Sequence, residues 1–280
     1  MSLLVFGSTG QLAAALRASA PDALFLNREA ADLTDPDTCA AAIHAAQTSA
    51  VINAAAYTAV DRAEEEEALA TAINAAAPGA MARACAEASI PFLHVSTDYV
   101  FDGSGQRPWR PEDPISPLNA YGRSKAAGEA AVRAAGGPHA ILRTSWVFSA
   151  TGRNFVTAML ELAQKRDQLN VVEDQIGGPT PACAIAEALL KMVEAMIAGQ
   201  GGGTYHFAGV PFVSWAGFAR EIFACSGQNV AVSDIPTSAY PTTAQRPLNS
   251  RLDCTSLEAD FDIRPPDWRA KLAEIVKELA

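Results

Sequence analysis

The sequence lacks several features that define common classes of protein. Its five cysteines are scattered along 280 residues without a CxxC pair, which indicates reduced thiols in a cytoplasmic protein rather than a disulfide framework. Its four histidines are also dispersed, so we expect no zinc site and no other bound metal. No apolar run reaches the roughly 18 residues that cross a bilayer, and the N-terminus has neither a basic segment nor a cleavage-like site. We therefore expect no membrane partner.

Positive charge is scarce as well. The chain carries 21 Lys and Arg against 31 Asp and Glu, which gives a formal net charge of −10. This balance argues against nucleic acid or an anionic membrane as a partner. A phosphorylated small molecule stays compatible with it, provided that helix N-termini, backbone amides and a few placed arginines bind the phosphates. The hydrophobic fraction of 49% supports a large core.

Short apolar runs and Ala-rich runs alternate in the first half of the chain. The apolar runs have the character of buried parallel strands, and the Ala-rich runs that of helices. This alternation predicts an α/β fold, a Rossmann-like doubly wound parallel sheet over residues 1–150 that binds NAD(P). Gly and Pro cluster beyond it, which predicts a smaller, loop-rich substrate lobe over 151–280, with elements at about 165–210 returning to the sheet. The predicted strands are LLVFG, ALFLN, AVINAAA, PFLHVST and AILRTSWVF.

A glycine turn follows the first predicted strand, in LLVFGSTGQLAAAL. Gly7 would make the turn, Gly10 would let the backbone approach a pyrophosphate, and the small Ala13 would let helix and strand pack closely. A plain tight turn is the alternative for such a pattern taken alone. Its place inside a βαβ unit at the N-terminus favours dinucleotide binding.

The end of the second predicted strand bears on the choice of cofactor. It lacks the acidic residue that would bind the ribose of NAD. Arg28 lies there instead and could accept a 2′-phosphate, which favours NADPH; a solvated surface arginine is the alternative. Asp32 and Leu33 follow and could cover the adenine. The third strand ends in Ala54–Ala56, small residues that leave room for a ligand crossing the sheet edge.

Polar residues suited to a reaction follow the fourth predicted strand and begin the next helix. The segment LHVSTDYVFDG ends a central strand in Ser96-Thr97-Asp98, at the carboxyl edge where ligands bind. Tyr121 and Lys125, in NAYGRSKAAGE, are one helical turn apart and so share a face. An ordinary exposed pair is the alternative for this spacing alone. The glycine turn and the polar strand ends that precede the pair favour a catalytic role.

The chemistry of this group predicts a proton donor. A tyrosine is a weak acid, with a reference pKa of ~10. An adjacent ammonium and an oxidised nicotinamide would both favour the phenolate and lower the pKa of Tyr121. Tyr121 could then give a proton to a carbonyl oxygen while hydride reaches the carbon, and Thr97 could hydrogen-bond the same oxygen. Lys125 would also hold the nicotinamide ribose, so we expect an oxidoreductase that uses NADPH or NADH.

These motifs, in this order, resemble the extended short-chain dehydrogenase/reductase superfamily, and within it the dTDP-4-dehydrorhamnose reductase family. The resemblance covers essentially the whole chain. It implies NAD(P)H-dependent reduction of the C4 keto group of dTDP-4-dehydro-β-L-rhamnose to dTDP-β-L-rhamnose, a precursor of cell-surface polysaccharide. The matching segments are GSTGQLA, NAAAYTAVDRAE, STDYVFDG, PLNAYGRSKAAGE, RTSWVFS, NFVTAML, DQIGGPT, YPTTAQRPLNSRLD and PDW.

Carried over residue by residue, the resemblance assigns Tyr121 as proton donor, Lys125 as its partner and Thr97 as the hydroxyl that tunes the transfer. Other residues match positions that bind the two ligands. The cofactor positions are Gly7, Gly10, Gln11, Leu12, Arg28, Asp32, Leu33, Ala56, Tyr57, Thr58, Tyr121 and Lys125, and the substrate positions are Thr97, Asp98, Trp146, Arg246, Asn249 and Arg251. Trp146 is either a core aromatic or an indole that stacks on the sugar, while the arginines suit a diphosphate.

The chain departs from part of this family in its first helix. Some members are described as dimerising through Mg²⁺ held by a glutamate there, and the matching residue is Ala15, so we expect no such site. The resemblance leaves a homodimer open.

Three alternatives to this function come from related proteins. A nucleotide-sugar dehydratase needs an acid after the Thr-Asp pair, where this chain has Tyr99. An epimerase, or a 4-keto reductase of another nucleotide sugar, is a second alternative; an epimerase needs acid/base groups on two faces of the sugar. The third is a non-catalytic NADP-binding regulatory subunit resembling that of methionine adenosyltransferase, against which the presence of all three reacting residues argues.

Overall fold

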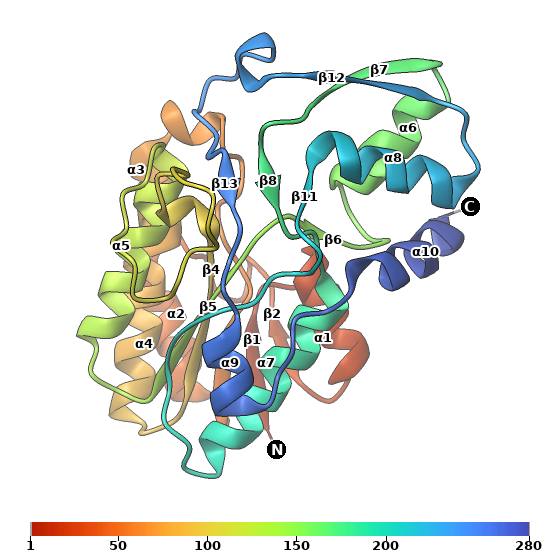
Figure 1. Cartoon of the computed structure of the whole chain (residues 1–280). Coiled ribbons are helices and arrows are strands. Elements are labelled where there is room, and N and C mark those ends of the chain that lie inside the picture. Colours follow the sequence, from red (N-terminus) through yellow and green to blue (C-terminus); the bar gives the residue numbers. More distant parts are fainter. Residues whose placement is uncertain (1, 280) are drawn as a thin grey trace.

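A six-stranded sheet forms the centre of the protein in a computed structural model that describes residues 2–279 (Figure 1). All of its strands are parallel, in the order β2-β1-β3-β4-β5-β10, so the predicted α/β class and doubly wound sheet are confirmed. Phe6 pairs with Asn53 and Thr97 with Thr144, so the carboxyl ends of the central strands lie along one edge. The strands are β1 (Leu3–Phe6), β2 (Leu24–Leu26), β3 (Ala50–Asn53), β4 (Phe92–Thr97), β5 (His139–Thr144) and β10 (Gly203–His206).

Helices cover both faces of this sheet. Successive side chains of a strand point to opposite faces, and in β1 Leu3 and Val5 join one core while Leu4 and Phe6 join the other. The first core is closed by α1 (Gln11–Ser19), α7 (Ala182–Ile197) and α9 (Thr255–Phe261). The second is closed by α2 (Pro36–Ala45), α4 (Ala77–Glu87) and α5 (Ala120–Ala134).

The segment between β3 and β4 is less regular than its Ala-rich sequence suggests. The sequence predicts helical character from residue 64 to 89, but the structure divides the segment into the 3₁₀ turn η1 (Arg62–Glu64), α3 (Glu67–Thr71), the π-helical turn η2 (Ala72–Ala76) and α4. Pro78 stands in the first turn of α4, where its missing N–H costs least. Asn74 in η2 uses its side chain to hold both the N–H and the carbonyl of Tyr57.

The prediction of one continuous strand over AILRTSWVF is wrong at its C-terminal end. β5 stops at Thr144, and Trp146 takes a left-handed backbone conformation with φ of 49°. This conformation turns the chain out of the sheet. The continuation β6 (Val147–Phe148) pairs instead with β9 (Thr180–Pro181).

A smaller lobe stands above the carboxyl edge of the sheet (Figure 1). Its core packs α6 (Phe155–Ala163), α8 (Trp215–Ser226) and α10 (Trp268–Leu279) against a two-stranded sheet, β7 (Gln168–Val172) with β12 (Ala231–Ile235). A second small sheet joins β8 (Ile176–Gly177) to β11 (Val213–Ser214) and β13 (Asn249–Ser250). Within the predicted returning segment, α7 and β10 lie with the main sheet, whereas β7 belongs to the lobe.

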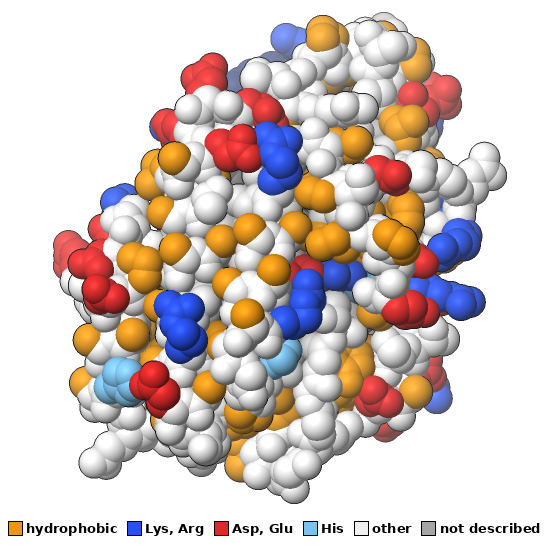
Figure 2. Space-filling model, turned by 90° about the vertical axis from the view of Figure 1, so that its left-hand side faces the viewer, with side chains coloured by type: hydrophobic (Ala, Val, Ile, Leu, Met, Phe, Trp, Pro, Cys, Tyr) orange, Lys and Arg blue, Asp and Glu red, His pale blue; other side chains and the backbone are white. Residues whose placement is uncertain are grey.

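Figure 2 shows the face that carries α3, α4 and α5. Apolar side chains are dispersed over it among polar and backbone atoms, and basic side chains stand beside acidic ones rather than in a single block. Isolated apolar side chains on a surface are ordinary. This face therefore presents no broad apolar or basic patch.

Candidate active site

A cleft of ≈ 720 Å³ opens where the sheet meets the smaller lobe. It lies at the carboxyl ends of β1, β3 and β4, and α1 follows β1 onto one face while α4 precedes β4 on the other. In open α/β sheets such a switch in the direction of winding is the position where ligands bind. Residues from both parts of the chain line the cleft, from Gly7 at one end of the sequence to Trp215 in α8.

The glycine turn forms one end of this cleft. Gly7 has a φ of 104°, and a Cβ placed there would lie 3.3 Å from Ala55. Both the backbone conformation and the close approach of Ala55 therefore favour glycine at this position. Gly10 is the N-cap of α1 and no side chain caps the helix, which leaves N–H groups of the first turn free for an anion. Gln11 and Leu12 also line the cleft.

The remaining residues predicted to bind the cofactor divide into two groups. Ala56 and Thr58 line the cleft. Tyr57 lies between them but donates its hydroxyl hydrogen to Glu66 at 2.6 Å. Arg28, Asp32 and Leu33 lie outside the cleft lining, beyond the end of β2, where the exposed Arg28 side chain pairs with Asp32 at 3.2 Å.

The three predicted reacting residues meet in the cleft. Thr97 ends β4, while Tyr121 and Lys125 lie one turn apart on α5, as the sequence predicts. Asn119 caps α5 by accepting a hydrogen bond from Gly122 N–H, which fixes where the helix begins. The spacing of the sequence and the geometry of the cleft therefore agree.

The acid–base properties of this group differ from the sequence-based expectation. Burial raises the pKa of Tyr121 to about 12, and the Thr97 hydroxyl acts in the opposite direction by hydrogen bonding. In the free protein the Lys125 Nζ donates to the carbonyl of Val95 at 2.7 Å and contacts His94 at 3.2 Å. Burial lowers the pKa of Lys125 to about 8.

Asp98 presents a buried carboxyl group to the same cleft. Its Oδ1 accepts a hydrogen bond from Thr97 at 3.0 Å, whereas the buried Oδ2 has no hydrogen bond of ordinary geometry within residues 2–279. Burial raises the pKa of this carboxyl to about 6, although the Ser250 hydroxyl acts on the same carboxyl in the lowering direction. An unpartnered buried acceptor beside the reacting residues fits a ligand that brings a hydroxyl group.

Two stacked tryptophans form part of the wall of the cleft. The rings of Trp146 and Trp215 stack with centroids 3.5 Å apart and planes inclined by 10°. A Cβ at Gly177 would lie 2.7 Å from the Trp146 ring, so this glycine is needed for the ring to take its place. Trp146 thus belongs to an aromatic cluster and lines the cleft at the same time.

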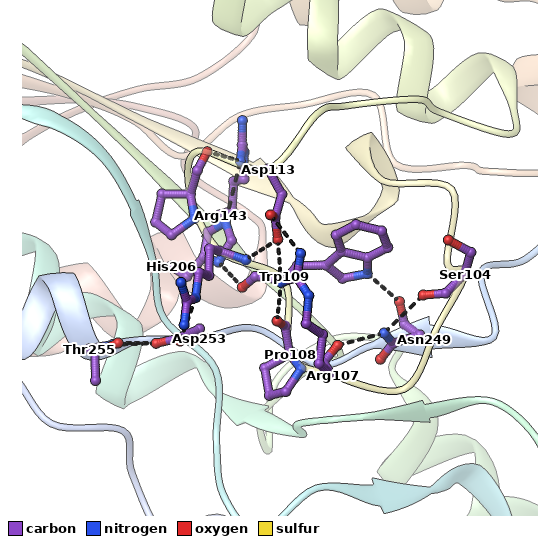
Figure 3. A network of polar contacts seen from close by, with 12 residues as sticks. Ser104, Arg107, Pro108, Trp109, Asp113, Arg143, His206, Asn249, Asp253 and Thr255 are labelled. Atoms are coloured by element: carbon purple, nitrogen blue, oxygen red, sulfur yellow. Dashed lines mark hydrogen bonds and ion pairs between the residues drawn. The ribbon is translucent and has the colours of Figure 1, made fainter.

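The three residues predicted near the diphosphate lie outside the cleft lining and have protein partners. Arg246 pairs with Asp61 at 2.6 Å. Asn249 is buried and donates its amide hydrogens to the carbonyls of Ser104 and Arg107, and its Oδ1 accepts from Arg251 at 3.0 Å. Figure 3 shows Asn249 within this network, in which the Trp109 indole also donates to the Asn249 carbonyl.

Other residues of the cleft escaped the sequence analysis. Asn53 lies at the end of β3 and Trp215 at the start of α8, and both line the cleft. Arg153 lines it too, with no ion pair to any residue between 2 and 279. Asn53 is the last residue of an apolar run, which is a usable signal, but nothing local in the sequence marks Trp215 or Arg153.

Two other classes of site are relevant to residues 2–279: a metal centre and a membrane span. No three His, Cys, Asp or Glu side chains gather as metal ligands within residues 2–279. No helix in the same range is long and apolar enough to cross a membrane.

The sheet, the glycine turn and the Thr97–Tyr121–Lys125 group together define a dinucleotide-binding protein of the extended short-chain dehydrogenase/reductase class. The family model described as RmlD substrate binding domain matches residues 1–280, and the chain belongs to this family. The predicted family membership is confirmed.

Two relatives with similar sequences carry the same enzyme name. A dTDP-4-dehydrorhamnose reductase from Sinorhizobium fredii is 44% identical over 286 residues, covering 99% of this chain and 97% of the relative. One from Burkholderia thailandensis is 42% identical, covering 100% of this chain and 99% of the relative.

Solved structures agree with these relatives. A dTDP-4-dehydrorhamnose reductase from Clostridium acetobutylicum superposes with a TM-score of 0.93 at 33% identity, over 100% of this chain and 99% of that one. One from Bacillus anthracis, in complex with NADP, gives 0.92 at 31% identity, over 99% of each chain. A dTDP-glucose 4,6-dehydratase from Streptomyces venezuelae, at 18% identity, shares the fold.

Proposed function

We propose that the protein is an NADPH-dependent oxidoreductase that reduces the C4 keto group of dTDP-4-dehydro-β-L-rhamnose to dTDP-β-L-rhamnose. The observation that carries this proposal is the meeting of Thr97, Tyr121 and Lys125 in one cleft with the glycine turn. The full-length relatives with the corresponding name support the choice of substrate. The product would serve the synthesis of cell-surface polysaccharide such as the O-antigen of lipopolysaccharide.

The residues present fit a bound dinucleotide. Gly7 and Gly10 leave the backbone open beside the uncapped start of α1, where a pyrophosphate would be held. NADPH would supply hydride to the substrate carbon. Its position at the carboxyl edge of the sheet would bring the nicotinamide towards Tyr121 and Lys125, which face the same cleft.

Tyr121 would deliver the proton. With a pKa raised to about 12 by burial, its phenol is protonated at neutral pH and ready to donate to the substrate oxygen. Thr97 would hydrogen-bond the same oxygen as negative charge develops. Lys125, whose pKa of about 8 leaves it mostly as ammonium at neutral pH, would stabilise the phenolate that remains.

Three further features suit the substrate. The unpartnered Oδ2 of Asp98 would accept a hydrogen bond from a sugar hydroxyl, and the Trp146–Trp215 stack would pack against the sugar ring. Arg153 would bind phosphate oxygens, since it lines the cleft without an ion pair. Arg246 and Arg251 would have to leave Asp61 and Asn249 to do so. We therefore propose Arg153 ahead of them for this role.

The first test is turnover by the purified chain, followed by NADPH absorbance and by analysis of the sugar product. We expect Tyr121→Phe to lower kcat by about 10²–10⁴-fold, because the proton donor is lost while the ring that packs in the cleft is kept. Tyr240→Phe, on an exposed tyrosine, is the matched control and should keep full activity. Near-full turnover by Tyr121→Phe would show that another group supplies the proton.

The same assay separates the alternatives. An epimerase or dehydratase would change the sugar without net consumption of NADPH, and a non-catalytic NADP-binding subunit would bind the cofactor without turnover. Tyr99 follows the Thr-Asp pair where a dehydratase would need an acid, and burial raises the pKa of its phenol.

We also infer a cytoplasmic location, in keeping with the five unpaired cysteines.

A further inference from the structure

A buried chain of polar side chains runs from β3 through β4 to the catalytic helix. Asn53 Nδ2 lies 3.2 Å from His94 Nδ1, and His94 Nε2 lies 3.2 Å from Lys125 Nζ. Each of the three residues is 2% exposed or less. His94, a buried residue of β4, therefore contacts the lysine of the reacting group directly.

The direction of these hydrogen bonds follows from the partners of Asn53. Its Oδ1 accepts from the N–H of Ala55 at 3.1 Å, so its Nδ2 must point a hydrogen at His94 Nδ1. A neutral imidazole that accepts at Nδ1 carries its hydrogen on Nε2. That hydrogen points at Lys125 Nζ.

A lysine can accept this hydrogen only as a neutral amine, because an ammonium has no lone pair. As an amine, Nζ accepts from His94 and still donates to the Val95 carbonyl at 2.7 Å. As an ammonium, Nζ either faces the Nε2–H of His94 or forces the other imidazole tautomer, whose Nδ1–H would then face the amide hydrogens of Asn53. One of the two protonation states of Lys125 therefore leaves a buried hydrogen-bond conflict.

We propose that His94 is a positioning residue for Lys125: held in the Nε2–H tautomer by Asn53, it keeps Nζ against the Val95 carbonyl and opposes the ammonium form. Lys125 then gains and loses its proton near neutral pH, instead of remaining an ammonium at every pH up to about 10. This proposal rests on the proposed function in one respect, which is that Lys125 acts beside Tyr121 in the reaction.

The other titratable groups around this chain do not take over this role. Glu129, one turn further along α5, favours the ammonium by its charge, but its oxygens are occupied by Arg143 and Ser96. Tyr121 lies one turn earlier. Burial and the charge of Lys125 hold the pKa of His94 well below its ordinary value, so the imidazole stays neutral.

The direct test is ¹⁵N NMR of protein labelled at its four histidines, with the His94 signals assigned by their loss in His94→Gln. We expect His94 as the neutral Nε2–H tautomer throughout about pH 6 to 9. Asn53→Asp should convert it to the Nδ1–H tautomer, because a carboxylate accepts where the amide donated. An imidazolium, or the Nδ1–H tautomer in the parent protein, would overturn the proposal. This readout needs no turnover, so it stands apart from the test of the reductase function.

The kinetic test uses the pH dependence of kcat/KM. Asn53→Asp frees His94 Nε2 to accept from the ammonium, so the alkaline limb that reports Lys125 should move up by about one pH unit or more. His94→Phe removes both hydrogen bonds and should move the same alkaline limb upward and lower kcat. In His94→Gln, whose amide can still donate to Nζ, the limb should lie closer to its position in the parent protein. His44→Phe, on a half-exposed histidine, is the matched control. An alkaline limb that stays fixed in both Asn53→Asp and His94→Phe would rule out the assigned role.

Discussion

Glu129 illustrates how single residues hold the catalytic helix in place. It is fully buried one turn beyond Lys125, and it accepts two hydrogen bonds from Arg143 and one from Ser96. Glu129→Gln would leave the buried guanidinium without its counter-charge, so we expect a loss of about 3–5 kcal/mol in the free energy of unfolding. Urea denaturation measures this loss. Glu258→Gln removes a comparable but exposed pair with Arg264 and should cost less than about 1 kcal/mol.

The same residue sets a dependence of stability on pH. Burial alone would raise the pKa of Glu129, but the hydrogen bonds and charge of Arg143 lower it below the ordinary value of 4.5. The stability that ionised Glu129 contributes to the fold is therefore fully present above its ordinary pKa of 4.5. It is lost as the pH falls through the lower pKa of the folded state. The acid limb of the stability curve should be shallower in Glu129→Gln than in the parent. Equal slopes would mean that other carboxyl groups control acid unfolding.

Arg28 carries the predicted preference for NADPH. It follows β2, beside the strand that leads into the glycine turn, and its side chain is exposed with Asp32 as its partner. We expect Arg28→Ala to raise KM for NADPH by about tenfold and to leave KM for NADH unchanged, because only NADPH has a 2′-phosphate. Steady-state kinetics with both cofactors measures this. Unchanged kinetics with both would show that Arg28 is a solvated surface residue.

Residue types and spacing were enough to find the centre of the site. Tyr121 and Lys125 are one helical turn apart in the sequence, and Thr97 ends a strand, so all three could be placed at the same edge. The partner of a polar side chain cannot be predicted in this way. Arg246 suits a diphosphate by its chemistry, yet in the fold it meets Asp61, which is 185 positions away in the chain.

At the scale of elements, the position of α5 depends on close contacts with its neighbours. A Cβ at Gly128 would lie 2.0 Å from the Asn74 carbonyl oxygen in η2. We expect Gly128→Ala to push α5 from the sheet, destabilise the fold by about 1–3 kcal/mol and lower turnover, because Lys125 lies on the same helix. Gly201→Ala is the control, since no atom lies within 4 Å of a Cβ there. Denaturation and kcat measured together check both effects; wild-type values of both for Gly128→Ala would contradict this account.

The elements that sequence reasoning misjudged are those that depend on contacts distant in the chain. The Ala-rich segment after β3 reads as continuous helix, but Asn74 bonds the Tyr57 backbone and Ser124 of α5, and the helix widens into a π turn there. The apolar run after β5 likewise reads as one strand. Packing of Trp146 on Trp215 and Gly177 accompanies the left-handed turn that ends it.

At the scale of the whole molecule, the cleft is assembled from both parts of the chain. The sheet supplies the glycine turn and the reacting residues, and the segments after β5 supply Trp146, Arg153 and Trp215. The alternation of strands and helices was sufficient to predict the sheet. It could not show that β7 leaves for the lobe while β10 adds the sheet's edge strand, because both are short runs in a Gly-rich context. The division at residue 150 remains a prediction.

The loop between β6 and α6 also ties the two parts together. The Ser149 hydroxyl donates to Gln11 Oε1 at 3.0 Å, and a Cβ at Gly152 would lie 3.6 Å from the Gln11 side chain, so this loop lies against the glycine turn. Residues 152–154 line the same cleft and would flank a dinucleotide held by that turn.

This contact has a consequence for the order of events in each catalytic cycle. We expect the dinucleotide to enter before the sugar nucleotide and to leave after it, with escape of NADP⁺ past the loop as the slow step. We expect NADP⁺ to inhibit competitively against NADPH, the sugar product to inhibit non-competitively against NADPH, and a rapid first turnover to precede the steady state. Ser149→Ala should speed the steady state and diminish that burst; random-order inhibition patterns would exclude an obligatory sequence.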